Sequence, residues 1–196
     1  MKTVPQSRFG AMRAVLALTT LLAASGCGGQ GAVSNDRVAS GIQVPVELVP
    51  ATASEVLQAV RDSGGRAVLV NVWATWCPPC LEEMPEILRF RKDFLGQGVE
   101  VILVSGDWDT ETQQVEAFLG ELGVDFPTYL KAGDDMEFIE TMSPEWSGAL
   151  PASFLFDSGG TLRHMWEGKV TYANLEEKVL PILETSQSQV KKEDIS

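Results

Sequence analysis

Two cysteines separated by two residues are the side chains of this sequence that most directly offer chemistry. Cys77 and Cys80 flank Pro78 and Pro79, at the point where an apolar, β-branched run ends and a helical pattern begins. A cysteine placed just before a helix meets unpaired backbone N–H groups and the positive end of the helix dipole, which favour a thiolate over a thiol. Cys77 is therefore the candidate nucleophile.

The first 26 residues have the pattern of a secretory signal. Three basic residues precede an apolar run over residues 14–24, which is too short to span a bilayer comfortably. Cys27 follows two small residues, which resembles a bacterial lipobox, although Ala24 stands where that pattern prefers leucine. The resemblance implies cleavage before Cys27 and lipidation of this residue. An ordinary signal peptide that leaves Cys27 as a free thiol is the alternative.

The cysteine count limits what the pair can do. With Cys27 lipidated, Cys77 and Cys80 are the only cysteines left, so no other thiol is available for a structural disulfide. The pair is then either redox-active or metal-binding. Export would place the chain in a periplasmic or cell-surface location where disulfides persist, and a reducing dithiol there needs a dedicated electron donor.

The charge of the chain excludes some partners. Its formal net charge is −12, and removal of the leader with its three basic residues takes the charge to −15. Nucleic acids and anionic lipid surfaces are therefore poor partners. We expect any membrane attachment to be made by acyl chains rather than by a basic patch.

Hydrophobic periodicity predicts alternating strands and helices in one domain over residues 41–184, between a flexible tether (27–40) and a polar, frayed C-terminal tail (185–196). The expected elements are an edge strand over 42–48, a helix capped by Thr52 or Ser54, a strand over 66–73, a helix over 78–95, a strand over 99–105, a helix over 109–122, a strand over 126–130, a helix over 134–142, a hairpin of 150–157 and 161–167, and a helix over 172–183. Strand 66–73, the next helix and strand 99–105 form a βαβ unit, which makes the two strands parallel, whereas the hairpin is antiparallel. The fold class is therefore α/β, with a mixed central sheet flanked by helices.

Three motifs in this order resemble the thioredoxin superfamily. They are WATWCPPC at 73–80, EEMP at 82–85, and PASFLFD at 151–157 followed by Gly159 or Gly160. The likeness is greatest to the exported, membrane-tethered TlpA/ResA-like branch and covers about residues 42–183. It implies a thioredoxin-like fold and a thiol:disulfide oxidoreductase without a cofactor other than its own cysteine pair. The implied partners are protein disulfide or dithiol substrates and a membrane or periplasmic electron donor.

The resemblance also implies roles for single residues. Cys77 would attack a substrate disulfide, and Cys80 would resolve the mixed disulfide. Pro151, after Leu150, aligns with the cis-proline that faces the two cysteines and lies beside the bound substrate. Pro78 and Pro79 shape the turn between the cysteines, and Trp76 is expected to shield the thiol.

The sequence departs from thioredoxin at Asn71, where thioredoxin keeps a buried carboxylate below its active site. Glu82 and Glu83 are close by, but we interpret them as first-turn residues favoured by the helix dipole. Pro78 and Pro79 remove two N–H donors, whereas later residues keep theirs. We therefore expect the helix N-terminus to supply most of the thiolate stabilisation.

Other functions and roles stay open at this point. Cys77, Cys80 and Met84 share a helical face and could hold a soft ion such as Cu(I), although the single histidine, His164, lies on the far hairpin strand. A redox-inactive binding module with the same fold is a further alternative. Trp146 either lines a substrate groove or anchors its loop in the core.

Overall fold

The structure, a computed structural model, describes residues 46–193, with side chains up to residue 186. Cys27, the predicted leader and the predicted tether lie outside the described residues. The elements are β1 Leu48–Ala51, α1 Ala53–Asp62, β2 Ala67–Trp73, α2 Pro78–Phe94, η1 Leu95–Gln97, β3 Val99–Ser105, η2 Asp109–Glu111, α3 Thr112–Glu121, β4 Thr128–Lys131, α4 Asp135–Met142, β5 Ala152–Asp157, β6 Leu162–Glu167 and α5 Tyr172–Glu193. No helix among these residues is long and apolar enough to cross a membrane.

Six strands form one mixed sheet in the order β1-β4-β3-β2-β5-β6. Strand β2 runs parallel to β3 over its whole length and antiparallel to β5, which confirms the predicted mixed sheet. All seven residues of β2 are buried, as its unbroken apolar sequence indicates for a central strand. The sheet thus carries the C-terminal end of β2 into the middle of the domain, where Cys77 follows.

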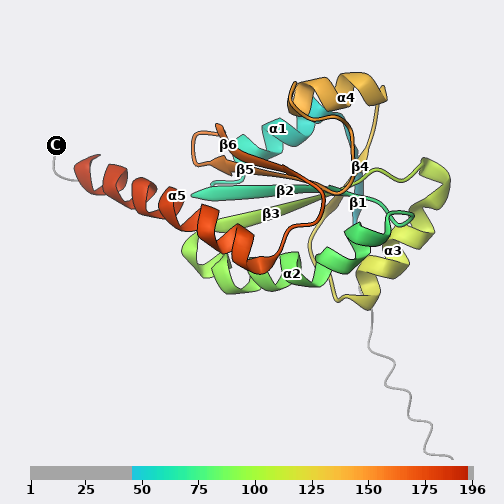
Figure 1. Ribbon diagram of the computed structural model, residues 1–196, viewed down its shortest axis with the longest axis horizontal. Helices are drawn as coiled ribbons and strands as arrows, with labels where there is room; N and C mark the ends of the chain where they lie inside the picture. The colour runs from blue at the N-terminus through green and yellow to red at the C-terminus, as the bar shows by residue number, and fades with distance from the viewer. Residues whose placement is uncertain (1–45, 194–196) are drawn as a thin grey trace, which may run out of the picture. The chain divides into compact units, whose positions relative to one another are not determined.

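Helices cover both faces of the sheet. Helices α2, α3 and α5 lie on one face, and α1 and α4 lie on the other (Figure 1). Side chains alternate along β2, so that Leu69 and Trp73 join the core below α2 and α5, whereas Val70 and Val72 join the core below α1 and α4. The same alternation turns Asn71 toward the α2 face.

Local capping explains where α1 begins. Thr52 is its N-cap: the Glu55 N–H donates to the Thr52 hydroxyl, and the Thr52 N–H donates to the Glu55 carboxylate at 2.8 Å. This reciprocal pair satisfies two donors of the first turn. Of the two caps considered from the sequence, Thr52 is the one used.

Three elements have different bounds from those predicted. Strand β1 begins only at Leu48. It does lie at the edge of the sheet, where Pro50 can be accommodated because its missing N–H is not needed for pairing with a further strand. Helix α3 begins at Thr112, because the preceding residues form the 3₁₀ helix η2. Helix α5 continues to Glu193 through much of the segment predicted to be a frayed tail. The hydroxyl of Ser186, in this extension, donates to the Ile182 carbonyl within α5 at 3.0 Å and also lies 3.5 Å from the Arg66 carbonyl before β2.

Candidate active site

The two cysteines of the WCPPC motif form a disulfide. The Sγ atoms of Cys77 and Cys80 are 2.03 Å apart, and Cys77 is the N-cap residue of α2. Cys77 is 5% exposed and Cys80 is fully buried. Only Cys77 therefore offers a partner any access to sulfur, which fits the predicted order of attack by Cys77 and resolution by Cys80.

The first turn of α2 does not present free amides to Cys77. Pro78 and Pro79 have no N–H, and the N–H groups of Cys80 and Leu81 donate to the Cys77 carbonyl at 3.0 and 3.2 Å. An N-cap side chain normally accepts from the second or third helical N–H. The dipole of α2 remains, but the amide hydrogen bonds expected from the sequence are absent in this oxidised state among the described residues.

The segment before β5 lies beside the cysteine turn. Ala152, which directly follows Pro151, pairs with Val72 near the end of β2. The Leu150–Pro151 peptide bond is cis, and the Pro151 carbonyl accepts a hydrogen bond from the Gly168 N–H at 2.8 Å. The sheet thus brings together Leu150, Pro151 and the turn that carries Cys77, which are 70 or more residues apart in the sequence.

A buried carboxylate lies below the site, and the sequence analysis misplaced it. Glu83 is fully buried. Its Oε1 accepts from the Asn71 side-chain amide at 2.8 Å, and its Oε2 accepts from the Val170 N–H at 2.8 Å. Burial raises the pKa of the Glu83 carboxyl, against the opposing effect of these hydrogen bonds. The expectation that Glu83 is only a first-turn residue is therefore wrong, since the carboxylate that Asn71 lacks is supplied from α2.

Helical spacing carried the signal for Glu83. Cys80, Met84 and Ile87 form the buried stripe of α2, and Glu83 lies at i+3 from Cys80 and i−4 from Ile87. Residues at these spacings share a helix face. Glu83 consequently follows Cys80 on the inward face of α2, whereas Glu82 is exposed and pairs with Lys169 at 2.9 Å.

A second buried carboxylate fixes the turn before the cysteines. Asp107, after β3, accepts from the Thr75 N–H at 3.0 Å and from the hydroxyl groups of Thr75 and Ser105. These bonds fasten the residue that directly precedes Trp76. The position of the Trp76 and Cys77 backbone is therefore set by β3 as well as by β2.

Two tryptophans next to Cys77 are exposed to solvent. Trp76 is 52% exposed and Trp108 is 66% exposed, and their rings stack with centroids 6.3 Å apart. One side of the Trp76 ring thus lies against Trp108, and the predicted shielding of the Cys77 thiol by Trp76 stays a prediction. Nothing in the local sequence pattern of Trp108 places it beside Trp76, so its position could not be predicted.

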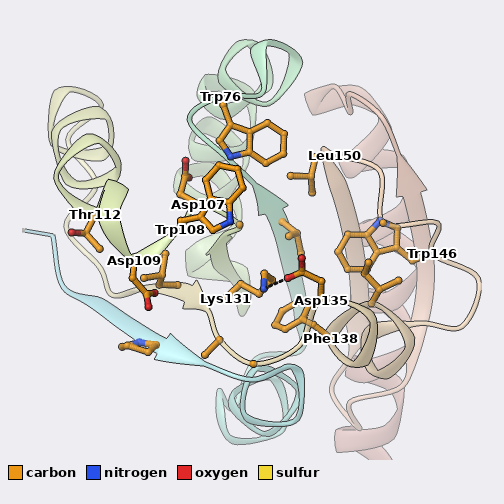
Figure 2. Close-up of a pocket in the computed structure, with 18 residues that line it drawn as sticks. Trp76, Asp107, Trp108, Asp109, Thr112, Lys131, Asp135, Phe138, Trp146 and Leu150 are labelled. Carbon is orange, nitrogen blue, oxygen red and sulfur yellow. Dashed lines mark hydrogen bonds and ion pairs between the residues drawn. The ribbon is translucent and has the colours of Figure 1, made fainter.

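A pocket of about 820 Å³ opens beside the disulfide turn. Figure 2 shows Trp76, Trp108 and Leu150 on one side of it, Trp146 and Phe138 on another, and the Lys131–Asp135 ion pair between them. Its lining comprises Pro50, Val72, Trp76, Gly106, Asp107, Trp108, Asp109, Thr112, Leu130, Lys131, Ala132, Gly133, Asp135, Phe138, Ile139, Trp146, Gly148 and Leu150. The pocket therefore joins the reactive turn to β4 and α4.

Trp146 anchors its loop in the core, and its role in a substrate groove stays a prediction. It is 6% exposed and packs edge-on against Phe154 with centroids 5.3 Å apart, while its Nε1–H donates to the Ala149 carbonyl at 2.9 Å. Gly148, with φ of 87°, lies so close to α4 that a Cβ would be 2.7 Å from Ile139 Cδ1. Trp146 is thus a buried anchor whose ring also lines the pocket.

Of the residues considered for Cu(I), Cys77, Cys80 and Met84 lie in one buried cluster, whereas His164 lies on the hairpin strand β6. Met84 is fully buried in the core, and His164 lies on β6, where it pairs with Leu155 of β5. Within residues 46–193, no group of three His, Cys, Asp or Glu side chains is placed to hold a metal ion.

The pattern of a cysteine pair, a neighbouring proline and a mixed sheet is shared with a known family. The Redoxin family matches residues 40–184. This chain belongs to the Redoxin family. The match spans all the elements from β1 to the main part of α5 and therefore the whole of the candidate site.

Curated relatives and a solved structure support the same assignment. The chain is 33% identical to the thiol-disulfide oxidoreductase ResA of Bacillus thuringiensis over 60% of its own length, and it spans 64% of that relative. It is 34% identical to ResA of Bacillus cereus over 62% of its length and 68% of the relative. A crystal structure of a thioredoxin family thiol:disulfide interchange protein from Chlorobium tepidum matches with a TM-score of 0.53 and 24% identity, over 71% of this chain and 97% of that one. The predicted likeness to ResA-type proteins and the thioredoxin-like fold are confirmed.

Proposed function

We propose that this protein is an extracytoplasmic thiol:disulfide oxidoreductase that reduces disulfides in client proteins. The observation that carries the proposal is the Cys77–Cys80 disulfide at the start of α2, beside Pro151 and at the edge of an open pocket. The names of the ResA relatives support the reaction class. An extended client segment would pair with the backbone beside Pro151, which is how an exposed strand end binds a peptide.

The reaction is an exchange of two electrons in two steps. The Cys77 thiolate attacks one sulfur of the client disulfide, which forms a mixed disulfide and releases the other client sulfur as a thiolate. The Cys80 sulfur then attacks Cys77 and releases the second client thiolate. The client gains two electrons and two protons, one from the Cys80 thiol and one from solvent because Cys77 reacts as a thiolate, while the protein is left with the Cys77–Cys80 disulfide. A dithiol donor at the membrane or in the periplasm must then reduce that disulfide.

We assign the transfer of the Cys80 proton to Glu83. It follows Cys80 by three residues on the buried face of α2, and its raised pKa brings it closer to the working pH than an exposed carboxyl group. In the proposed second step, Glu83 takes the Cys80 proton as Cys80 attacks Cys77. The proton then passes to the departing client thiolate.

We infer that the protein donates electrons to its clients, because its reduced dithiol form is poorly stabilised. A disulfide is a strong oxidant when its reduced thiolate is well stabilised. Here two prolines and the Cys77 carbonyl leave no helix amide for the Cys77 sulfur. A buried carboxylate near Cys80 also disfavours a second negative charge. Both features favour the disulfide form and make the dithiol a reductant.

The location is part of the proposal and is supported by the sequence alone. The signal pattern over residues 1–26 and the lipobox-like Cys27 support export and attachment to a membrane through lipid. Mass spectrometry of the mature protein from its host tests this, with Cys27→Ser as the control. A diacylated N-terminal cysteine supports the anchor, whereas an unmodified mature N-terminus contradicts it.

Trapping of the mixed disulfide tests the reaction itself. The Cys80→Ser variant, expressed in the native host, should accumulate client proteins bound to Cys77 in a form that dithiothreitol releases. The Cys77→Ser, Cys80→Ser double variant is the matched control and should trap none. Failure to recover any covalent partner, together with failure of the reduced wild type to reduce a model protein disulfide such as insulin, would overturn the proposal and favour a redox-inactive binding module.

A further inference from the structure

The surface around Cys77 has the composition of a protein-binding site. Trp76 and Trp108 are two of the most exposed large apolar side chains among the described residues, and they stack on each other beside the reactive turn. Exposed aromatic side chains gathered in one place mark interaction sites, and tryptophan is enriched among the residues that dominate binding energy. The pair also borders the pocket, so a partner held there would lie next to Cys77.

The pocket is continuous with the place where the client disulfide must lie. Trp76 immediately precedes Cys77, and Leu150 immediately precedes Pro151; both line the pocket, as Figure 2 shows. A client backbone that pairs beside Pro151 would therefore direct a neighbouring side chain between these two residues. The volume of about 820 Å³ is large enough for more than one side chain, because sites of about 300–1,000 Å³ hold whole small ligands.

The walls of the pocket favour a positive charge at its rim. The lining includes Asp107, Asp109 and Asp135 but a single cation, Lys131. Lys131 is paired with Asp135, and Asp107 is occupied by the groups of Thr75 and Ser105. Asp109 is exposed and has no ion-pair partner in the described part of the chain. The Trp108 ring next to it can also attract a cation through its face.

We propose that this pocket selects the client of the oxidoreductase. It takes an extended segment of the client protein in which an aromatic side chain near the reactive cysteine enters between Trp76 and Leu150, while an adjacent lysine or arginine lies over Trp108 toward Asp109. The proposal rests on the function proposed above. It assigns to Trp108 and Asp109 a role in client choice.

Matched disulfide peptides test the preference of the pocket. Four peptides with one disulfide differ only at two positions next to a cysteine, with tryptophan or alanine at the first and lysine or glutamate at the second. One set carries these positions on the N-terminal side of the cysteine and another set on the C-terminal side. In one of the sets we expect the reduced protein to act on the tryptophan peptide with a kcat/KM about tenfold above that on the alanine peptide. We expect lysine to exceed glutamate by about threefold or more, and this ratio to shrink in high salt.

Variants of exposed residues connect the preference to the pocket. Trp76→Ala should reduce the ratio between the tryptophan and alanine peptides to about one, whereas Trp108→Ala and Asp109→Asn should each reduce the ratio between the lysine and glutamate peptides. Leu180→Ala is the matched control, because Leu180 is an exposed apolar side chain on α5 that does not line the pocket. It should leave both ratios unchanged. The midpoint potential of each variant shows whether a change arises from client binding or from the cysteines.

The outcomes separate this proposal from the function on which it rests. Equal kcat/KM values for all peptides, from a protein that does reduce them and reduces a small aromatic disulfide, would overturn the pocket assignment alone. No reduction of any disulfide would overturn the proposed function. Binding of the same peptides with serine in place of cysteine, followed by tryptophan fluorescence, would then still test the pocket, and the absence of a preference for the tryptophan–lysine peptide would overturn it.

Discussion

The Asn71 side-chain amide donates to the buried Glu83 carboxylate across 2.8 Å, and the same nitrogen lies 3.1 Å from the hydroxyl oxygen of Ser153. Asn71 and Ser153 face each other in the register of β2 and β5, and Glu83 comes from α2. The Val170 N–H before α5 completes the cluster. Four segments thus meet around one buried carboxylate near the start of α2, and because burial raises its pKa, its protonation is linked to the stability of the fold.

Replacement of Glu83 by glutamine tests the raised pKa. A carboxyl group whose pKa is higher in the folded than in the unfolded protein binds more protons when folded, so stability falls as the pH rises from about 4.5 through the raised value. Glutamine does not titrate. The free energy of unfolding of Glu83→Gln, relative to wild type, should therefore increase with pH across this window, by about 1.4 kcal/mol for each tenfold difference in proton affinity. Urea unfolding of the oxidised proteins between pH 4 and 8 measures it.

Glu82→Gln is the control for this series, because Glu82 is the exposed neighbour of Glu83 on the same helix. Its ion pair with Lys169 is at the surface, where such pairs contribute less than about 1 kcal/mol. The free energy of unfolding of Glu82→Gln, plotted against pH, should run nearly parallel to that of the wild type. Parallel curves for Glu83→Gln as well would contradict the assignment of a raised pKa to Glu83.

Asn71→Asp adds a second carboxylate to the same buried cluster. It replaces the amide donor to Glu83 by an acceptor, and two neighbouring carboxylates cannot both ionise without mutual repulsion. We expect this variant to be less stable than wild type at pH 7, by about 1–3 kcal/mol or more for the lost donor to a buried group, and to regain stability as the pH falls. Thermal unfolding at pH 5 and pH 7 checks the direction. A loss that is equal at both pH values would indicate that charge is not the cause.

The sequence predicted the framework of the site but not its surroundings. The motif around Cys77, the proline before β5 and the apolar runs of β2 and β3 are local patterns, so the parallel pairing of β2 with β3 and the antiparallel hairpin of β5 and β6 followed from them. The bounds of β1 and α5 could not be predicted from local patterns, because edge strands and helix ends depend on tertiary contacts such as the pairing of β1 with β4.

The pocket could not be predicted because it joins distant parts of the chain. Trp76 and Trp108 are 32 residues apart, and only the parallel pairing of β2 with β3 makes their rings meet. The error over Glu83 was of another kind. Its helical spacing placed it on the buried stripe, but an acidic residue is rarely buried unless hydrogen-bonded, and its partners come from β2 and from the segment before α5.

Pro79→Ala tests the cause proposed for the reducing character. Pro79 is the second helical residue after the N-cap Cys77, which is one of the positions whose N–H normally donates to an N-cap side chain. Alanine restores that donor and should stabilise the Cys77 thiolate. The midpoint potential should become more positive by about 30 mV, which corresponds to about 1.4 kcal/mol for a two-electron couple.

Pro78→Ala is the matched control, since the N–H of the first helical residue does not cap the side chain. Its potential should change by much less than that of Pro79→Ala. Equilibration with glutathione or dithiothreitol buffers gives both values. If the two variants shifted the midpoint potential equally, the missing N–H donor at Pro79 would not explain the proposed reducing character.

Trp146→Phe tests whether the segment before Pro151 is held by a single hydrogen bond. Phenylalanine keeps the aromatic packing on Phe154 but removes the Nε1–H that donates to the Ala149 carbonyl at 2.9 Å. We expect a loss of about 1 kcal/mol in the free energy of unfolding, which is the usual contribution of one hydrogen bond, plus a smaller loss of packing. Trp108→Phe, at a site 66% exposed, should change stability by less than about 0.5 kcal/mol. Urea unfolding compares the two, and an equal effect at both sites would show that the bond to Ala149 does not hold the segment.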